Sequence, residues 1–225
     1  YLTFTPNRNV YGRGVDQKLG RSNFASFSLK YTRGLDGILQ GNFSYNQLQF
    51  SYEHPIRISF FGILESNLEL GKTFDPVPIA LLTALPANQG YSLIPRTFSL
   101  INYYDWISDN YLLGHFEHHF NGFIMNKIPL LEKLKLRSLV TFRFAYGSIS
   151  NDNISKNKSK IVYNSPSNKP YYEYSLGIEN IGFGNFKFFR ADFIWRSDLH
   201  DTFLTNSPKN GVPKFGIRLG AKPNF

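Results

Sequence analysis

Three residues with acid–base or metal-binding side chains stand at alternate positions near the middle of the chain: His115, Glu117 and His119. In an extended strand they share one face, with neighbours about 6.8 Å apart. Two histidines on one face can share a zinc ion, and an acid beside a histidine can serve hydrolysis. The sequence offers neither a Ser–His pairing nor a second carboxylate motif. We therefore expect no catalytic residue and no cofactor, and a metal at His115 and His119 is only the minor alternative to a polar network.

Charged residues alternate with apolar ones in other segments as well. If such a segment crosses a membrane, its charges must face the interior, because an Arg exposed to lipid at the midplane costs about 2–4 kcal/mol. The expected interior network consists of Arg96, Glu117, Arg143, Glu173, Glu179, Arg190, Asp192 and Arg218. We expect these groups to pair and to fix the shape of the protein, with a selectivity filter as the alternative. The residues expected to face lipid are Phe142, Phe144, Trp195 and Ile217.

The elements that must position these groups are strands, because the apolar pattern has a period of two. It predicts about eight strands, near residues 25–33, 48–52, 64–70, 112–120, 140–146, 172–178, 189–195 and 215–219. Two all-β architectures fit such strands. A soluble sandwich turns the apolar faces inward, whereas a membrane barrel turns them toward lipid.

Strand length, aromatic residues and loop lengths favour a transmembrane antiparallel β-barrel. The strands run to about ten residues, as tilted spanning strands do. Tyr and Trp gather near strand ends, as in an aromatic girdle (Tyr103, Tyr104, Trp106, Tyr146, Tyr171, Tyr172). Long links alternate with short ones, as surface loops alternate with periplasmic turns in outer-membrane barrels. This alternation places Phe225 at the periplasmic rim as a C-terminal signal, and it predicts localisation to the outer membrane of a Gram-negative bacterium.

Composition excludes several classes of protein. The chain has 225 residues, a net charge of +9 and no cysteine, so it has no disulfide framework, thiolate metal site or cysteine nucleophile. Its longest apolar runs, such as residues 58–64, reach about seven residues, against the ~18 that a spanning helix needs. A helical membrane protein is therefore excluded. The 42% hydrophobic content excludes a disordered chain.

The links between the strands also carry expectations. Residues 53–55 and 182–185 are expected to be tight turns. Residues 128–135 are expected to form a short amphipathic segment at the inner interface of the membrane, or an extended turn. The lysine-rich link 151–169 predicts a solvated loop that meets anionic lipopolysaccharide. The expected partners are thus lipid, lipopolysaccharide and other subunits of an outer-membrane complex, and not nucleic acid.

The chain begins at Tyr1, which favours a piece of a longer protein with an upstream domain missing. Residues 1–24 are expected to be a loop or plug-like lead-in, and residues 25–222 are expected to hold the strands.

Several runs carry a resemblance to a known family. They are Pro6-Asn7-Arg8-Asn9, Gly20-Arg21-Ser22-Asn23-Phe24, Asn102-Tyr103-Tyr104-Asp105-Trp106-Ile107-Ser108-Asp109, Phe116-Glu117-His118-His119-Phe120-Asn121-Gly122 and Ile128-Pro129-Leu130-Leu131. Over essentially the whole chain, the sequence resembles a family of Bacteroidetes outer-membrane proteins of unassigned function. Members carry an N-terminal carboxypeptidase-regulatory-like β-sandwich and a C-terminal barrel. The resemblance implies that this chain is the C-terminal portion of such a protein.

The chain also resembles, more distantly, the BamA-type barrels that insert or translocate outer-membrane proteins. Their barrels have about sixteen strands, so this chain corresponds to the C-terminal half. Their sixth loop carries a Val-Arg-Gly-aromatic motif that folds back into the lumen. Here the longest link contains Ile94-Pro95-Arg96-Thr97-Phe98, in which Thr97 replaces the glycine. This likeness predicts that Arg96 points into the lumen and bonds a carboxylate such as Glu117 or Glu173. Loss of a desolvated pair of this kind costs about 3–5 kcal/mol.

Three functions follow as expectations. The first is a non-enzymatic, BamA-like barrel in outer-membrane biogenesis or protein export. The second is a pore or docking barrel of a nutrient-uptake or secretion complex. The third is a barrel hydrolase that uses His115 and His119.

Overall fold

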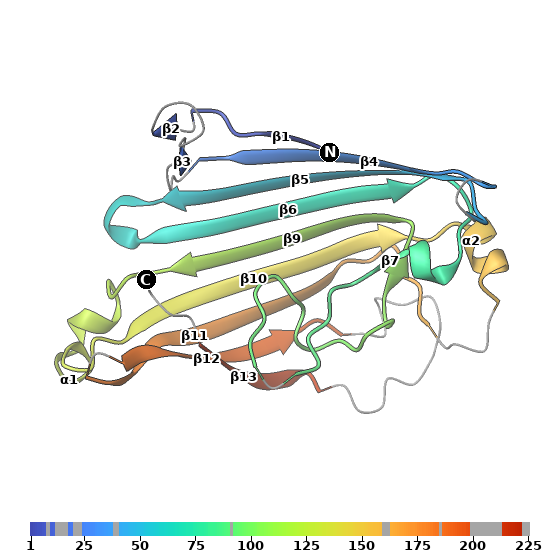
Figure 1. Ribbon diagram of the computed structural model, residues 1–225. Coiled ribbons are helices and arrows are strands. Elements are labelled where there is room, and N and C mark those ends of the chain that lie inside the picture. Colours follow the sequence, from blue (N-terminus) through green and yellow to red (C-terminus); the bar gives the residue numbers. More distant parts are fainter. Residues whose placement is uncertain are drawn as a thin grey trace.

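The strands of this computed structural model lie side by side in one antiparallel sheet, from β1 and β4 at the top of Figure 1 to β13 at the bottom. The structure describes residues 1–7, 10–11, 18–19, 24–37, 41–90, 92–158, 163–184, 186–198 and 213–221. In spatial order the nine strands are β1 (Leu2–Phe4), β4 (Ser26–Gly34), β5 (Tyr45–Arg57), β6 (Ile63–Thr73), β9 (Asn110–His119), β10 (Arg137–Ser148), β11 (Tyr171–Phe183), β12 (Phe186–Arg196) and β13 (Phe215–Ala221).

The eight strands expected from the period-two pattern are all present, and the protein is all-β and antiparallel. Within the described residues the sheet is open, with β1 and β13 as its edges. The expected lead-in at residues 1–24 contains a strand, because Leu2–Phe4 pairs with the Phe27–Leu29 part of β4. Two small two-stranded sheets complete the described strands: β2 (Val10–Tyr11) with β3 (Lys18–Leu19), and β7 (Thr83–Ala84) with β8 (Ile107–Ser108).

The expected turn at residues 53–55 is wrong. β5 continues through Pro55, which pairs with Glu65 of β6, and the chain reverses at η2 (Ser59–Phe61) and Gly62. A proline normally breaks a strand because it has no N–H to donate. Here the pairing of β5 with β4 ends at Glu53, so beyond that residue β5 pairs on one side only within the described segments. Pro55 is therefore tolerated at an open edge.

The short helices lie at opposite ends of the strands (Figure 1). At one end, η4 (Met125–Lys127) and α1 (Pro129–Glu132) form part of the link expected to be amphipathic. At the other end, α2 (Asn151–Lys156) occupies the link expected to be a solvated loop. That link is partly packed: Asn153 and Asn157 of the α2 region are buried, and their side chains bond the backbone of Val77. No helix of the described segments is long and apolar enough to cross a membrane.

The hydrophobic core lies between the sheet and the long link that joins β6 to β9. This link carries η3 (Ile79–Leu81), and it crosses in front of the later strands in Figure 1. Phe98 and Trp106 of the link pack with Leu113 of β9 and Ala145 of β10, all of them buried. Tyr171, expected in an aromatic girdle together with Trp106, belongs to the same cluster. These two aromatic residues are therefore core residues. We call the covered side of the sheet the inner face.

Candidate functional site

The inner face of β9 to β12 carries a network of buried charges, with Arg190 of β12 at its centre. Arg190 donates from Nη1 and Nη2 to the two oxygens of Glu117, at 2.6 and 2.8 Å. It also donates from Nε and Nη2 to the two oxygens of Asp192, each at 2.7 Å. The side chains of Arg190 and Asp192 are 3% and 0% exposed, so this planar fork joins two carboxylates away from water.

His119 extends the network along β9. Its Nε2 lies 2.8 Å from Glu117 Oε1, and its Nδ1 lies 3.1 Å from Glu179 Oε2. Because both ring nitrogens face carboxylate oxygens, only the protonated ring, which has two N–H groups, satisfies both contacts. Glu65 of β6 stands at 4.0 Å from Nε2. The network thus ties four strands together from the inside.

His115 and His119 do not share one cluster of candidate metal ligands in the described part of the chain. The ligand atoms of Glu65, Glu117 and His119 lie within 4.8 Å of one another, and His115 is not in this group. Both oxygens of Glu117 accept N–H groups of Arg190, whose positive charge opposes a divalent ion at this place. The contacts between these side chains are those of an ion-pair network.

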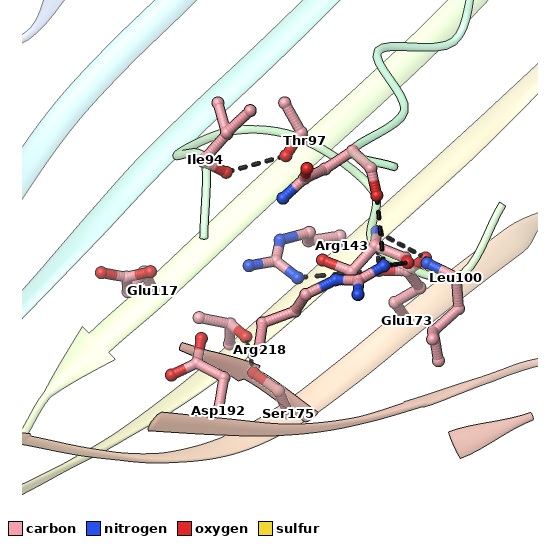
Figure 2. A network of polar contacts seen from close by, with 12 residues as sticks. Ile94, Thr97, Leu100, Glu117, Arg143, Glu173, Ser175, Asp192 and Arg218 are labelled. Carbon is pink, nitrogen blue, oxygen red and sulfur yellow. Dashed lines mark hydrogen bonds and ion pairs between the residues drawn. The ribbon is translucent and has the colours of Figure 1, made fainter. Parts of the chain in front are cut away.

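Glu173 of β11 anchors the long link to the sheet (Figure 2). Its carboxylate is fully buried and accepts hydrogen bonds from the backbone N–H groups of Ser99 and Leu100, at 2.7–3.0 Å. The hydroxyl of Tyr171 donates to the same carboxylate at 2.7 Å. Arg143 Nη1 stands 3.6 Å away. One buried acid therefore holds the link against the inner face.

Arg218 of β13 bonds the same link from the edge of the sheet. Its Nη2 donates to the carbonyl oxygens of Asn88 at 3.2 Å and Ser99 at 2.8 Å. Farther along, the N–H of Leu93 donates to the carbonyl oxygen of Leu219 at 2.7 Å. The link is thus folded back over the sheet, and its backbone polar groups are satisfied there.

Arg96 bonds a carboxylate other than the two named from the sequence. Its Nη1 and Nη2 donate to the two oxygens of Glu53, at 2.7 and 3.0 Å. Glu117 and Glu173 are instead occupied by Arg190 and by the link backbone. The side chains of Arg96 and Glu53 are 57% and 42% exposed, so this pair is solvated. The large cost expected for losing Arg96 rested on desolvation and does not apply to this pair.

Two residues of the inner face were missed in the sequence. Glu53 lies in the expected turn 53–55, although the alternation of Gln49, Ser51 and Glu53 indicates the polar face of β5. Tyr111 is outside the expected network; its hydroxyl donates to Glu69 at 2.7 Å and accepts from Gln49 at 2.8 Å. A tyrosine among the polar residues of an alternating strand is the signal that could have identified it.

The outer face carries the four residues expected to face lipid. Phe142 and Ile217 are exposed, and Phe144 and Trp195 are half-exposed. They are neighbours of further aromatic residues across the strands; Trp195, for instance, stacks on Tyr174 with ring centroids 5.7 Å apart. Phe225, expected as a C-terminal signal, lies outside the described residues.

A cavity of about 520 Å³ lies between the inner face and the turn of the long link at Pro95 and Arg96. Its walls include Thr141, Arg143 and Arg190. This is the concave, partly polar setting in which small-molecule sites are usually found.

Comparison with known proteins identifies a family but no activity. Residues 1–178 match the model of a family described as a family of unknown function (DUF5686), C-terminal domain. No curated protein and no solved structure matches the chain. The match covers most of the 225 residues and agrees with the resemblance to a family of unassigned function. The chain therefore belongs to the DUF5686 family, of which it carries the C-terminal domain.

Proposed function

We propose that this chain is part of a BamA-like outer-membrane β-barrel that acts in outer-membrane biogenesis or protein export. The observation that carries the proposal is the distribution of side chains across the sheet. The outer face is apolar and exposed: Phe142 is 43%, Leu176 is 55% and Ile217 is 51% exposed. Their sequence neighbours Arg143 and Ser175 are buried on the inner face. An apolar surface of this extent needs a covering, and lipid is the covering that also suits charges turned inward.

Strand lengths support the same proposal. The six strands from β5 to β12 in the sheet have 10 to 13 residues, as the spanning strands of a tilted barrel require. The open edges at β1 and β13 call for further strands, and the BamA-type likeness implies about sixteen in total. The resemblance to Bacteroidetes outer-membrane proteins adds an N-terminal carboxypeptidase-regulatory-like domain in the periplasm of a Gram-negative cell.

Side chains at the ends of the strands support a proposal for which end of the sheet lies on the periplasmic side of the membrane. Phe60, Phe183 and Phe186, at the tips of the two short turns, are 65%, 92% and 75% exposed. Exposed aromatic side chains of this kind suit a membrane interface, and short turns are periplasmic in outer-membrane barrels. The opposite end, with α2 and the lysine-rich link, then faces lipopolysaccharide and the other subunits of a surface complex.

Single cysteines test which face meets lipid, since the chain has no cysteine of its own. Spin labels at Phe142→Cys and Ile217→Cys, in the protein reconstituted in vesicles, are expected to collide with oxygen, which concentrates in lipid. They are expected to be shielded from a water-soluble nickel chelate. A label at Lys158→Cys, an exposed loop position, should show the reverse. Equal access of the nickel chelate to all three positions would sink the membrane assignment.

Reconstitution of the complete protein in liposomes tests the role in biogenesis. Vesicles with the protein are expected to speed the insertion of a urea-unfolded outer-membrane barrel relative to empty vesicles. They are expected to carry no steady ionic current, because the long link covers the inner face. A steady current without faster insertion would instead support the second hypothesis, a pore of a nutrient-uptake or secretion complex. The control is the heat-denatured protein in the same vesicles.

A further inference from the structure

Arg143 of β10 is a buried cation without a hydrogen bond in the described part of the chain. Its side chain is 5% exposed, and its closest ionic contact is Nη1 to Glu173 Oε2 at 3.6 Å, beyond hydrogen-bonding distance. An arginine keeps its charge in a protein and offers five N–H donors. Nearly all buried polar groups are bonded, so the buried and unbonded Nη1 of Arg143 calls for an acceptor.

Glu173 does not supply that acceptor, because other donors already occupy it. It accepts from the N–H groups of Ser99 and Leu100 and from the hydroxyl of Tyr171. Figure 2 shows Leu100 at the Glu173 carboxylate, with the Arg143 guanidinium to one side. The position of the long link thus draws the carboxylate away from Arg143.

A second unbonded group lies across the strand from Arg143. His115 of β9 is its partner in the register, and it is 8% exposed. Both ring nitrogens of His115 lack a hydrogen-bond partner, and the ring packs against Phe98 with centroids 5.1 Å apart. Two neighbouring residues therefore have unused donors or acceptors at one place.

Arg218 of β13 is a second cation, and like Glu173 it bonds Ser99 of the long link. In the part of the chain that the structure describes, Arg218 bonds carbonyl oxygens only and has no carboxylate within ion-pair distance. Its register partner in β12, Asp192, is held by Arg190. Away from bulk water, a cation without a hydrogen-bonded carboxylate favours a bound anion, because charge interactions are stronger at a low effective dielectric constant.

Arg143 and His115 both line the 520 Å³ cavity described above. Glu65 and Glu117 line it as well, and Arg190 holds the Glu117 carboxylate. A cavity of this volume is within the range of about 300–1,000 Å³ that is usual for small-molecule sites. Arg96 lines it too, but its guanidinium bonds Glu53. Among the described cations of this wall, Arg143 is therefore the one without a hydrogen bond to a carboxylate.

We propose that this cavity binds a small organic carboxylate, whose two oxygens accept the N–H fork of Arg143 while His115 lies alongside. A planar carboxylate matches a guanidinium in two parallel hydrogen bonds, which a spherical anion does not. The ligand enters the space between the inner face and the Pro95–Arg96 turn. The inference goes beyond a role in biogenesis and does not depend on it, since it concerns binding to the purified protein.

Saturation-transfer NMR and calorimetric titration of the detergent-solubilised protein test the site. The probes are succinate and benzoate, with inorganic phosphate and chloride at matched ionic strength. We expect saturable binding of at least one carboxylate probe with a Kd of about 1 mM or below. Arg143→Gln is expected to weaken it at least about tenfold, and Arg143→Lys, which keeps the charge but not the fork, to weaken it less. Arg57→Gln removes the same charge at an exposed position of β5 and should leave the Kd unchanged.

Three results would overturn the proposal: no saturable carboxylate binding, equal affinity for phosphate or chloride, or equal affinity in Arg143→Gln. Circular dichroism of each variant separates loss of binding from loss of the fold. If Arg143→Gln does not fold, the Kd of Arg143→Lys is compared with that of the native protein. An unchanged Kd in Arg143→Lys would contradict binding through the two parallel hydrogen bonds of the guanidinium. Insertion activity in liposomes plays no part in this readout, so failure here leaves the proposed function standing.

Discussion

Arg190→Ala is expected to destabilise the protein by about 3–5 kcal/mol, the usual cost of leaving a buried charge without its partner. The substitution removes the guanidinium that bonds both Glu117 and Asp192, whose side chains are 21% and 0% exposed. Two carboxylates then stand close together in a poorly solvated place. The measurement is the temperature at which the detergent-solubilised protein loses its β signal in circular dichroism, or its heat-dependent mobility on gels.

Matched variants isolate the cause of that loss. Lys214→Ala removes a cation from an ion pair with Asp198 whose side chains are 70% and 47% exposed, and it should leave the melting temperature unchanged. Arg190→Lys should lie between Arg190→Ala and the native protein, because an ammonium cannot bond both carboxylates with a planar fork. If Arg190→Ala and Lys214→Ala melt alike, the buried network does not stabilise the sheet.

Glu173→Gln is expected to release the long link from the inner face while the sheet stays folded. The amide keeps the size of the side chain but loses the charge that accepts the N–H groups of Ser99 and Leu100. A hydrogen bond to a charged group contributes about 1.5–3 kcal/mol, so local opening should become at least about tenfold more frequent. Hydrogen exchange at Ser99 and Leu100 measures it directly, and chymotrypsin should cut after Phe98, which is 0% exposed in the native protein.

The control for this variant is Glu132→Gln, an exposed acid of α1 that loses the same charge. It should leave exchange at Ser99 and Leu100 unchanged. Protection at these two amides that survives Glu173→Gln would contradict the anchoring role of the carboxylate.

The strands could be predicted from the sequence because side chains alternate strictly between two different environments. The pattern failed where that signal is short or ambiguous. β1 has only three residues, and the proline at position 55 predicts the end of a strand although β5 is no longer paired with β4 there. The helical turn of α2 was missed because its buried Asn153 and Asn157 look like loop residues in the sequence.

The inner-face charges were predictable as a set, but their pairing was not. Alternation places Glu117 and Arg190 on the same face, yet nothing in the sequence joins residues that are 73 positions apart. Their contact depends on the order of the strands and on the bending of the sheet. The sequence predicts a carboxylate partner for Arg96 but cannot select Glu53. The donors that occupy Glu117 and Glu173, which are Arg190 and the link backbone, are visible only in the folded chain.

The contact between Arg190 and Glu117 has a mechanical consequence. β12 and β9 are separated by β10 and β11, so in a flat sheet their backbones would stand roughly 14 Å apart, three strand spacings. A direct bond of 2.6 Å across that distance acts as a brace on the concave side. The brace opposes flattening of the sheet between β9 and β12. A single substitution at Arg190 removes it without removing any hydrogen bond between the strands, so we expect the sheet to flatten more easily at this point.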